Sequence, residues 1–193
     1  MDFHRVTATA DPLYAPAMAL YRASFPSHEQ RQTASQEAIL SHPDYHFLVL
    51  TEQGAPVGIL LNWDTPHFRY IEHFAISPAL RGRSFGSRAL QAWADRADTP
   101  VILEIDPLTT DIAVRRKRFY ERLGFMLNPF PHVHPPYHDG LTGHALLVLS
   151  RPEALDAFFD QVFSSVRLPV SVKTRLGYQT PEEFPRLLEI FNR

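Results

Sequence analysis

One short segment of the sequence combines glycines and arginines with the predicted start of a helix. The run Ile76-Ser77-Pro78-Ala79-Leu80-Arg81-Gly82-Arg83-Ser84-Phe85-Gly86-Ser87 follows a predicted strand and enters a predicted helix. A helix N-terminus offers unpaired N–H groups and about half a positive charge, which suits phosphate. Gly82 and Gly86 would let a ligand approach the backbone closely. The segment therefore predicts an anion site, although a plain strand-to-helix turn with solvated arginines has the same composition.

A second group with possible chemistry lies in the proline-rich segment 131–138. Its histidines His132, His134 and His138 are of a type that binds zinc. No carboxylate pattern accompanies them, so we expect no metal here. A stiff aromatic wall beside a substrate, or a plain surface loop, is the preferred interpretation of this segment.

Composition restricts the classes of function. The 193-residue chain has a net charge of −2 and no cysteine, which excludes disulfides, thiolate metal sites and a cysteine nucleophile. A protein without a basic field is not expected to bind nucleic acid or an anionic membrane. No run approaches the ~18 apolar residues of a membrane span, and the first residues lack a signal-peptide pattern. We therefore expect a cytoplasmic protein.

The hydrophobic pattern predicts the strands and helices that would position the glycine-arginine segment and the histidine segment. Predicted strands cover 3–7, 46–50, 57–63, 68–76, 101–105, 125–127 and 144–149, and residues 128–143 are expected to be a loop. Predicted helices begin after Asp11-Pro12 and at residues 35, 85 and 111. Beyond residue 150, an apolar stripe predicts a further helix; its members are Leu155, Phe158, Phe159, Val162 and Val166.

Two motifs resemble those of the Gcn5-related N-acetyltransferase (GNAT) family. Motif A of that family reads Gln/Arg-x-x-Gly-x-Gly/Ala at the start of a helix. Arg81 fills its first position and Gly86 its last, whereas Ser84 stands where the family usually has glycine. Further on, the run Arg118-Phe119-Tyr120-Glu121-Arg122-Leu123-Gly124-Phe125 matches the family's Phe/Leu-Tyr-x-x-x-Gly-Phe. The resemblance covers roughly residues 3–150.

The resemblance implies an α+β (mixed α/β) fold with a central mixed, mostly antiparallel sheet flanked by helices. Residues 1–150 would form the acetyl-CoA-binding catalytic domain. Residues 151–193 would be a C-terminal helical extension, packed either on that domain or on a partner subunit; the second arrangement would make a homodimer, and the sequence leaves the choice open. Acyl-CoA would lie where the strand ending at Ile76 splays from the strand 101–105. The implied CoA-binding residues are Phe74, Ala75, Ile76, Arg81, Gly82, Arg83, Ser84, Phe85, Gly86, Ser87 and Arg116.

Acyl transfer to an amine requires a neutral amine and a proton for the leaving thiolate. The resemblance places Tyr120 beside the CoA sulfur, and a phenol is protonated at neutral pH, so Tyr120 is the candidate acid. Glu104 and Glu72, in predicted central strands, are alternative bases, and the resemblance adds His73. A hydrogen-bonded structural role is the other interpretation of each, and the sequence leaves the choice open. Strict alternation would put Glu72 on one face with Phe74 and Ile76, opposite His73.

Three functions are consistent with these residues. The first is an N-acetyltransferase that moves the acetyl group of acetyl-CoA directly to an amine, because no cysteine can carry an acyl intermediate. The second is a non-catalytic acyl-CoA-binding regulatory module, against which the presence of Tyr120 argues. The third is a hydrolase with a metal bound by the histidines of residues 131–138. The first is preferred, and the identity of the amine is left open.

Overall fold

The computed structural model describes residues 1–66, 68–129, 131–138 and 140–151. Its strands are β1 (Asp2–Val6), β2 (Tyr45–Glu52), β3 (Ala55–Asp64), β4 (Arg69–Ile76), β5 (Val101–Ile105), β6 (Met126–Leu127), β7 (His132–His134) and β8 (His144–Ser150). Its helices are α1 (Tyr14–Ser24), α2 (Thr33–Ala38), α3 (Phe85–Ala94) and α4 (Asp111–Glu121), with short 3₁₀ turns η1 (Ser27–Glu29) and η2 (Pro78–Leu80). The predicted extension at 151–193 lies outside the described residues except for Arg151.

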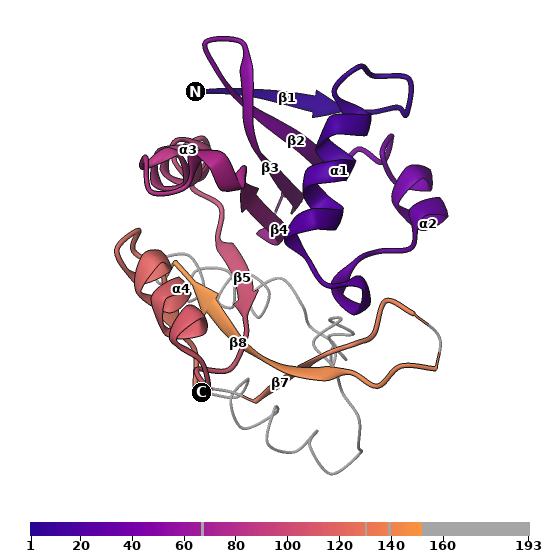
Figure 1. Ribbon diagram of the computed structural model, residues 1–193. Coiled ribbons are helices and arrows are strands. Elements are labelled where there is room, and N and C mark those ends of the chain that lie inside the picture. The colour runs from indigo at the N-terminus through magenta and orange to yellow at the C-terminus, as the bar shows by residue number, and fades with distance from the viewer. Residues whose placement is uncertain (67, 130, 139, 152–193) are drawn as a thin grey trace.

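The strands form one mixed sheet in the order β1-β2-β3-β4-β5-β8-β6, with β7 paired to the first half of β8. Every pairing is antiparallel except that of β4 with β5, which is parallel. A parallel pair needs a crossover connection, and α3 supplies it. The predicted α+β fold with a mostly antiparallel sheet flanked by helices is confirmed (Figure 1).

Two apolar cores lie on the two faces of the sheet. One is built around α1 and includes Tyr21, Phe47 and Ala75. The other is built around α3 and α4 and includes Trp93 and Tyr120. The helices accordingly lie on opposite sides of the strands (Figure 1). Neighbouring residues of a central strand therefore face different helices, and each face can carry its own polar site.

Local sequence signals fix the helix starts close to their predicted positions. Asp11 Oδ1 accepts a hydrogen bond from the Leu13 N–H at 2.8 Å, and α1 begins at Tyr14. Thr110 caps α4 through a bond from the Ala113 N–H at 3.1 Å, as expected of an N-cap threonine. Within the described residues, no helix is long and apolar enough to cross a membrane.

The strict alternation predicted for β4 is wrong at Glu72. On β3, Leu61 pairs with His73 and the next residue, Asn62, pairs with Ile71, so Glu72 is an extra residue in a β-bulge. Ile71 packs with the α3 core, as do the later residues on that face. The bulge turns Glu72 away from that core, to the same side as His73, instead of leaving it with Phe74.

The predicted loop 128–143 contains a strand that the pattern did not predict. β7 is only three residues long and pairs His132 with Leu146 and His134 with His144. Prolines flank it on both sides in sequence, so local propensity favours a loop. Its pairing with β8, across the intervening loop, adds His132 and His134 to the sheet.

Candidate active site

The two central parallel strands separate halfway along β4. Arg69, Tyr70 and Ile71 pair with Val101, Ile102 and Leu103 in turn, and the pairing ends there. From Glu72 to Ile76, β4 has β3 on one side and no paired strand on the other within the described residues. The strands thus open a gap toward the end of β4, as the resemblance implied.

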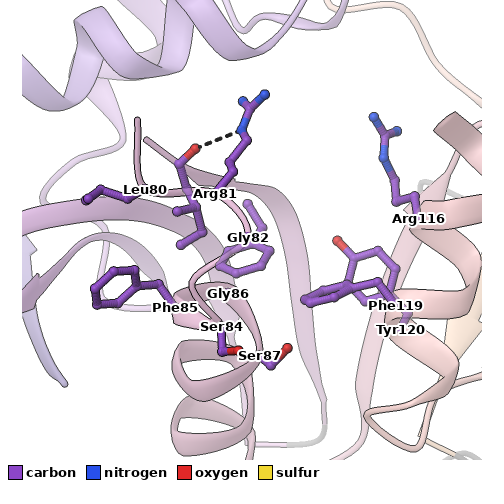
Figure 2. A pocket seen from close by; sticks show the side chains of 12 residues that line it. Leu80, Arg81, Gly82, Ser84, Phe85, Gly86, Ser87, Arg116, Phe119 and Tyr120 are labelled. Carbon is purple, nitrogen blue, oxygen red and sulfur yellow. Dashed lines mark hydrogen bonds between the residues drawn. The ribbon is translucent and has the colours of Figure 1, made fainter. Parts of the chain in front are cut away.

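A pocket of about 490 Å³ lies at this gap, between α3 and α4. Figure 2 shows it bounded by the turn before α3 on one side and by α4 on the other. Its walls are Phe74, Ile76, Leu80, Arg81, Gly82, Ser84, Phe85, Gly86, Ser87, Arg116, Phe119 and Tyr120. Most of the residues predicted to bind CoA therefore line one cavity. Ala75 and Arg83 do not line it, because Ala75 packs in the α1 core and Arg83 lies over the Phe85 ring.

The turn before α3 presents its backbone to the pocket. Gly82 has a φ of +77°, a conformation that residues with a Cβ rarely adopt. Ser84 is the N-cap residue of α3, with a left-handed φ of 60°, and its side chain makes no capping hydrogen bond. The first N–H groups of α3 are therefore not satisfied by the cap, and they lie at the positive end of the helix dipole.

Two arginines line the pocket from opposite walls. Arg81 is held over the end of β4, where its Nε donates to the Ile76 carbonyl at 3.3 Å (Figure 2). Arg116, on α4, is exposed and paired with Asp106 at 2.6 Å. Both guanidinium groups keep donors that an anion in the pocket can use.

Tyr120 stands on the α4 wall of the same pocket. Its ring packs edge-on against Phe125 at 5.7 Å and is almost fully buried. Its hydroxyl makes no hydrogen bond with any described residue, and it points into the space between α4 and the turn before α3 (Figure 2). Burial, partly offset by the charge of Arg116, raises the pKa of Tyr120 to about 12. The phenol therefore holds its proton at all ordinary pH values.

On the opposite side of the gap, Glu72 is the centre of a buried polar cluster. Its Oε1 accepts hydrogen bonds from Arg31 and from the Tyr137 hydroxyl, the latter at 2.8 Å, whereas Oε2 has no hydrogen-bond partner. Burial alone would raise the pKa of Glu72, but His73, Arg31 and the bond from Tyr137 together lower it. Glu72 is therefore an anion at neutral pH, with one oxygen free.

Glu104 lies one residue beyond the last β4–β5 pair. Side chains of two other strands, β4 and β7, contact its carboxylate. The Tyr70 hydroxyl donates to its Oε2 at 3.1 Å, and Nε2 of His132 lies 2.8 Å from its Oε1. Nε2 of His134 lies 3.7 Å from Oε2. Burial, followed by the charge of Glu104, raises the pKa of Tyr70, so this phenol remains a donor to the carboxylate.

The three histidines of residues 131–138 do not converge on one point. Nε2 of His138 lies 3.0 Å from the Ser27 carbonyl oxygen and 2.9 Å from that of Gln30, so this residue fastens the segment to η1. His132 and His134 face Glu104 instead. No group of three or more potential ligands is arranged around a metal position in the part of the chain that the structure describes.

Sequence reasoning missed the residues that partner Glu72. Arg31 comes from the segment after η1, where its N–H also bonds the Tyr21 hydroxyl at 2.8 Å. Tyr137 follows β7, and the Arg31 guanidinium lies over its ring at 5.5 Å. The sequence did single out the segment 131–138, which contains Tyr137, as a possible aromatic wall, but it gave no signal for Arg31.

Comparisons with known proteins agree with this architecture. The family model described as "Acetyltransferase (GNAT) family" matches residues 3–125. A putative acetyltransferase from GNAT family from Bacteroides thetaiotaomicron is 26% identical, with a TM-score of 0.75 over 89% of this chain and all of that one. The comparison with curated proteins gave no match.

Two more distant solved structures share the fold. The ribosomal-protein-S18-alanine N-acetyltransferase from Escherichia coli is 16% identical, with a TM-score of 0.52 over 77% of this chain and 91% of that one. The aminoglycoside 6'-N-acetyltransferase from Enterococcus faecium is also 16% identical, with a TM-score of 0.54 over 78% and 96%. The matched family model covers both motifs and the strands that open the gap, so the chain belongs to the GNAT family of acetyltransferases.

Proposed function

We propose that this chain is an N-acetyltransferase that binds acetyl-CoA in the pocket between α3 and α4 and passes the acetyl group directly to an amine. The observation that carries the proposal is the pocket itself. It joins the uncapped start of α3 to the gap between β4 and β5, with Tyr120 on its wall. A phosphate-binding turn and a proton donor thus face one cavity.

The pocket fits the parts of acyl-CoA. The pyrophosphate is assigned to the N–H groups at the start of α3, with Arg81 and Arg116 as cationic neighbours. The pantetheine arm is assigned to the open edge of β4 at Phe74, whose ring is stacked 6.5 Å from that of Phe119 on α4. The thioester would then lie in the gap near the Tyr120 hydroxyl.

The chemistry follows from the groups on the two sides of the gap. The amine enters from the side of Glu72 and Glu104 and attacks the thioester carbonyl carbon. The C–S bond breaks, its electron pair leaves with sulfur, and Tyr120 donates a proton to the thiolate. The buried negative charge of Glu72 favours an acceptor that arrives as an ammonium ion.

Thiol release from acetyl-CoA over a panel of amines tests the proposal. The panel should include small amines, amino acids, an aminoglycoside, and peptides with a free N-terminus or a lysine. Amine-dependent release of CoA is expected for at least one class, with a matching mass increase of the acceptor. Tight acetyl-CoA binding without release for any amine would indicate a non-catalytic binding module instead.

A further inference from the structure

The two carboxylates expected to act as base are both engaged by other groups. Glu72 is an anion paired with Arg31, and its pKa is lowered, which makes it a weak proton acceptor. Glu104 already accepts a hydrogen bond from Tyr70 and meets His132. A different group with an available lone pair is needed to take the proton of an incoming ammonium ion.

His134 has such a lone pair, because its other nitrogen is committed. Nδ1 lies 2.6 Å from the carbonyl oxygen of Pro135. A carbonyl oxygen only accepts, so Nδ1 carries the proton, and in the neutral ring Nε2 is unprotonated. Nε2 has no hydrogen-bond partner among the described residues, and 14% of the side chain is exposed. Nε2 can therefore accept a proton.

Glu104 is placed to stabilise the ring once it is protonated. Its Oε2 lies 3.7 Å from Nε2 of His134, close enough for a carboxylate to favour an imidazolium. The Tyr70 hydroxyl holds the same Oε2 from β4. Tyr70 thus holds the Glu104 carboxylate beside Nε2 of His134, while the Pro135 carbonyl keeps the proton of the neutral ring on Nδ1.

The position of His134 also fits the reaction path. Glu104, which it faces, follows Leu103, the last residue of β5 that pairs with β4, at the opening of the gap. Tyr137 links His134 to the other carboxylate of the gap: its ring lies 5.0 Å from the His134 ring, and its hydroxyl donates to Glu72 at 2.8 Å.

We propose that Nε2 of His134 is the proton acceptor for the amine, with Glu104 as the counter-ion of the protonated ring; this rests on the proposed acetyltransferase function. The ammonium gives one proton to Nε2, and the freed electron pair forms the C–N bond. Tyr120 gives its proton to the departing sulfur and recovers one, through water, from the nitrogen of the tetrahedral intermediate. His134 then releases its proton to solvent.

Several titratable groups lie around the His134 ring, and they affect how the reaction rate depends on pH. They are Glu104 on β5, His132 on β7, Tyr137 after it, His144 on β8, His28 and Glu29 on η1, and His73 on β4. Burial lowers the pKa of both His73 and His144, and the charges of His134 and His28 lower that of His144 further. These two rings therefore stay neutral to lower pH than an ordinary histidine.

The pH profile of kcat/KM for the amine tests the assignment. The wild-type rate should fall on acidification as Nε2 is protonated. In His134→Asn, whose amide can still donate to the Pro135 carbonyl, kcat should drop by about 10²–10⁴-fold and the acid limb should disappear. KM for acetyl-CoA should stay unchanged, and added imidazole should partly restore the rate of His134→Ala. The control His46→Asn, in β2, should keep both the rate and the limb.

Each outcome separates this inference from the proposed function. If the wild-type protein releases no CoA with any amine, the proposed function fails. If it turns over while His134→Asn keeps the acid limb, only the role of His134 fails. A nitrogen NMR spectrum of the wild-type protein gives a readout that needs no variant. A proton on Nε2, with a bare Nδ1, at neutral pH would also overturn the assignment.

Discussion

Arg31 and Glu72 form an ion pair within the protein, between the segment after η1 and the bulge of β4. Their side chains are 8% and 4% exposed. A buried pair adds little compared with an apolar pair of the same shape, but removing one partner leaves a buried charge uncompensated. The pair therefore couples the placement of the segment after η1 to that of β4.

Replacing only the cation of this pair should be strongly destabilising. Arg31→Met is expected to lower the free energy of unfolding by about 3–5 kcal/mol. The double variant Arg31→Met with Glu72→Gln should recover part of that loss, because no charge is left buried. Urea unfolding of the single and double variants measures the coupling, and simple additivity would contradict it.

The same pair predicts how stability depends on acid. Because the pKa of Glu72 is lowered in the folded state, its contribution is full above the unfolded-state value of about 4.5 and is lost as pH falls through the folded value. The difference in unfolding free energy between wild type and Glu72→Gln should therefore shrink as pH falls below about 4.5. A difference that is constant down to pH 2 would indicate that Glu72 is not ionised when folded.

Gly86→Asp should remove acetyl-CoA binding while the fold is kept. A Cβ at Gly86 would lie 3.5 Å from Ile76 Cγ1 and 3.6 Å from Phe119 Cζ, which are ordinary van der Waals contacts, so a methyl group fits. The aspartate adds a negative charge where the pyrophosphate is expected. We expect affinity to fall by about 100-fold or more, about 2.7 kcal/mol, by calorimetry. Gly86→Ala is the matched control and should bind nearly as wild type.

Tyr120→Phe should separate catalysis from binding. The packing against Phe125 remains while the proton donor is lost, so kcat should fall about 10²–10⁴-fold with little change in KM for acetyl-CoA. Because the pKa of Tyr120 is raised to about 12, its titration should not lower the rate between pH 7 and about pH 10. Tyr14→Phe, in α1, should leave kcat unchanged. A fully active Tyr120→Phe would mean that water protonates the thiolate.

Ser84→Gly should stabilise the protein. Ser84 has a left-handed φ of 60°, which costs a residue with a Cβ about 1–2 kcal/mol. Part of that gain is offset by the greater freedom of glycine when unfolded, so we expect about 0.5–1 kcal/mol of net stabilisation. Thermal unfolding tests it. Ser87→Gly, inside α3, should lower the melting temperature instead.

Elements with local signals were predictable from the sequence, and so was the pocket. The strand 101–105 was placed from its compact apolar run between prolines, and the start of α3 from its glycine-rich turn. The partners of Glu72 were not, because Arg31 is 41 positions away in the chain and Tyr137 is 65. No local pattern encodes pairing at such separations. The strand β7 was missed because prolines flank its three residues, so only its pairing with β8 makes it a strand.

The bulge at Glu72 reverses which residues of β4, the odd-numbered or the even-numbered, face the α3 side of the sheet. Before it, the odd-numbered Arg69 and Ile71 face that side; after it, the even-numbered Phe74 and Ile76 do. A chain lacking Glu72 alone would alternate without interruption and still present all four of these residues to α3. The apolar cores thus place no demand on this residue. It is an insertion that packing tolerates, and what it adds is the carboxylate that gathers Arg31 and Tyr137 from two loops.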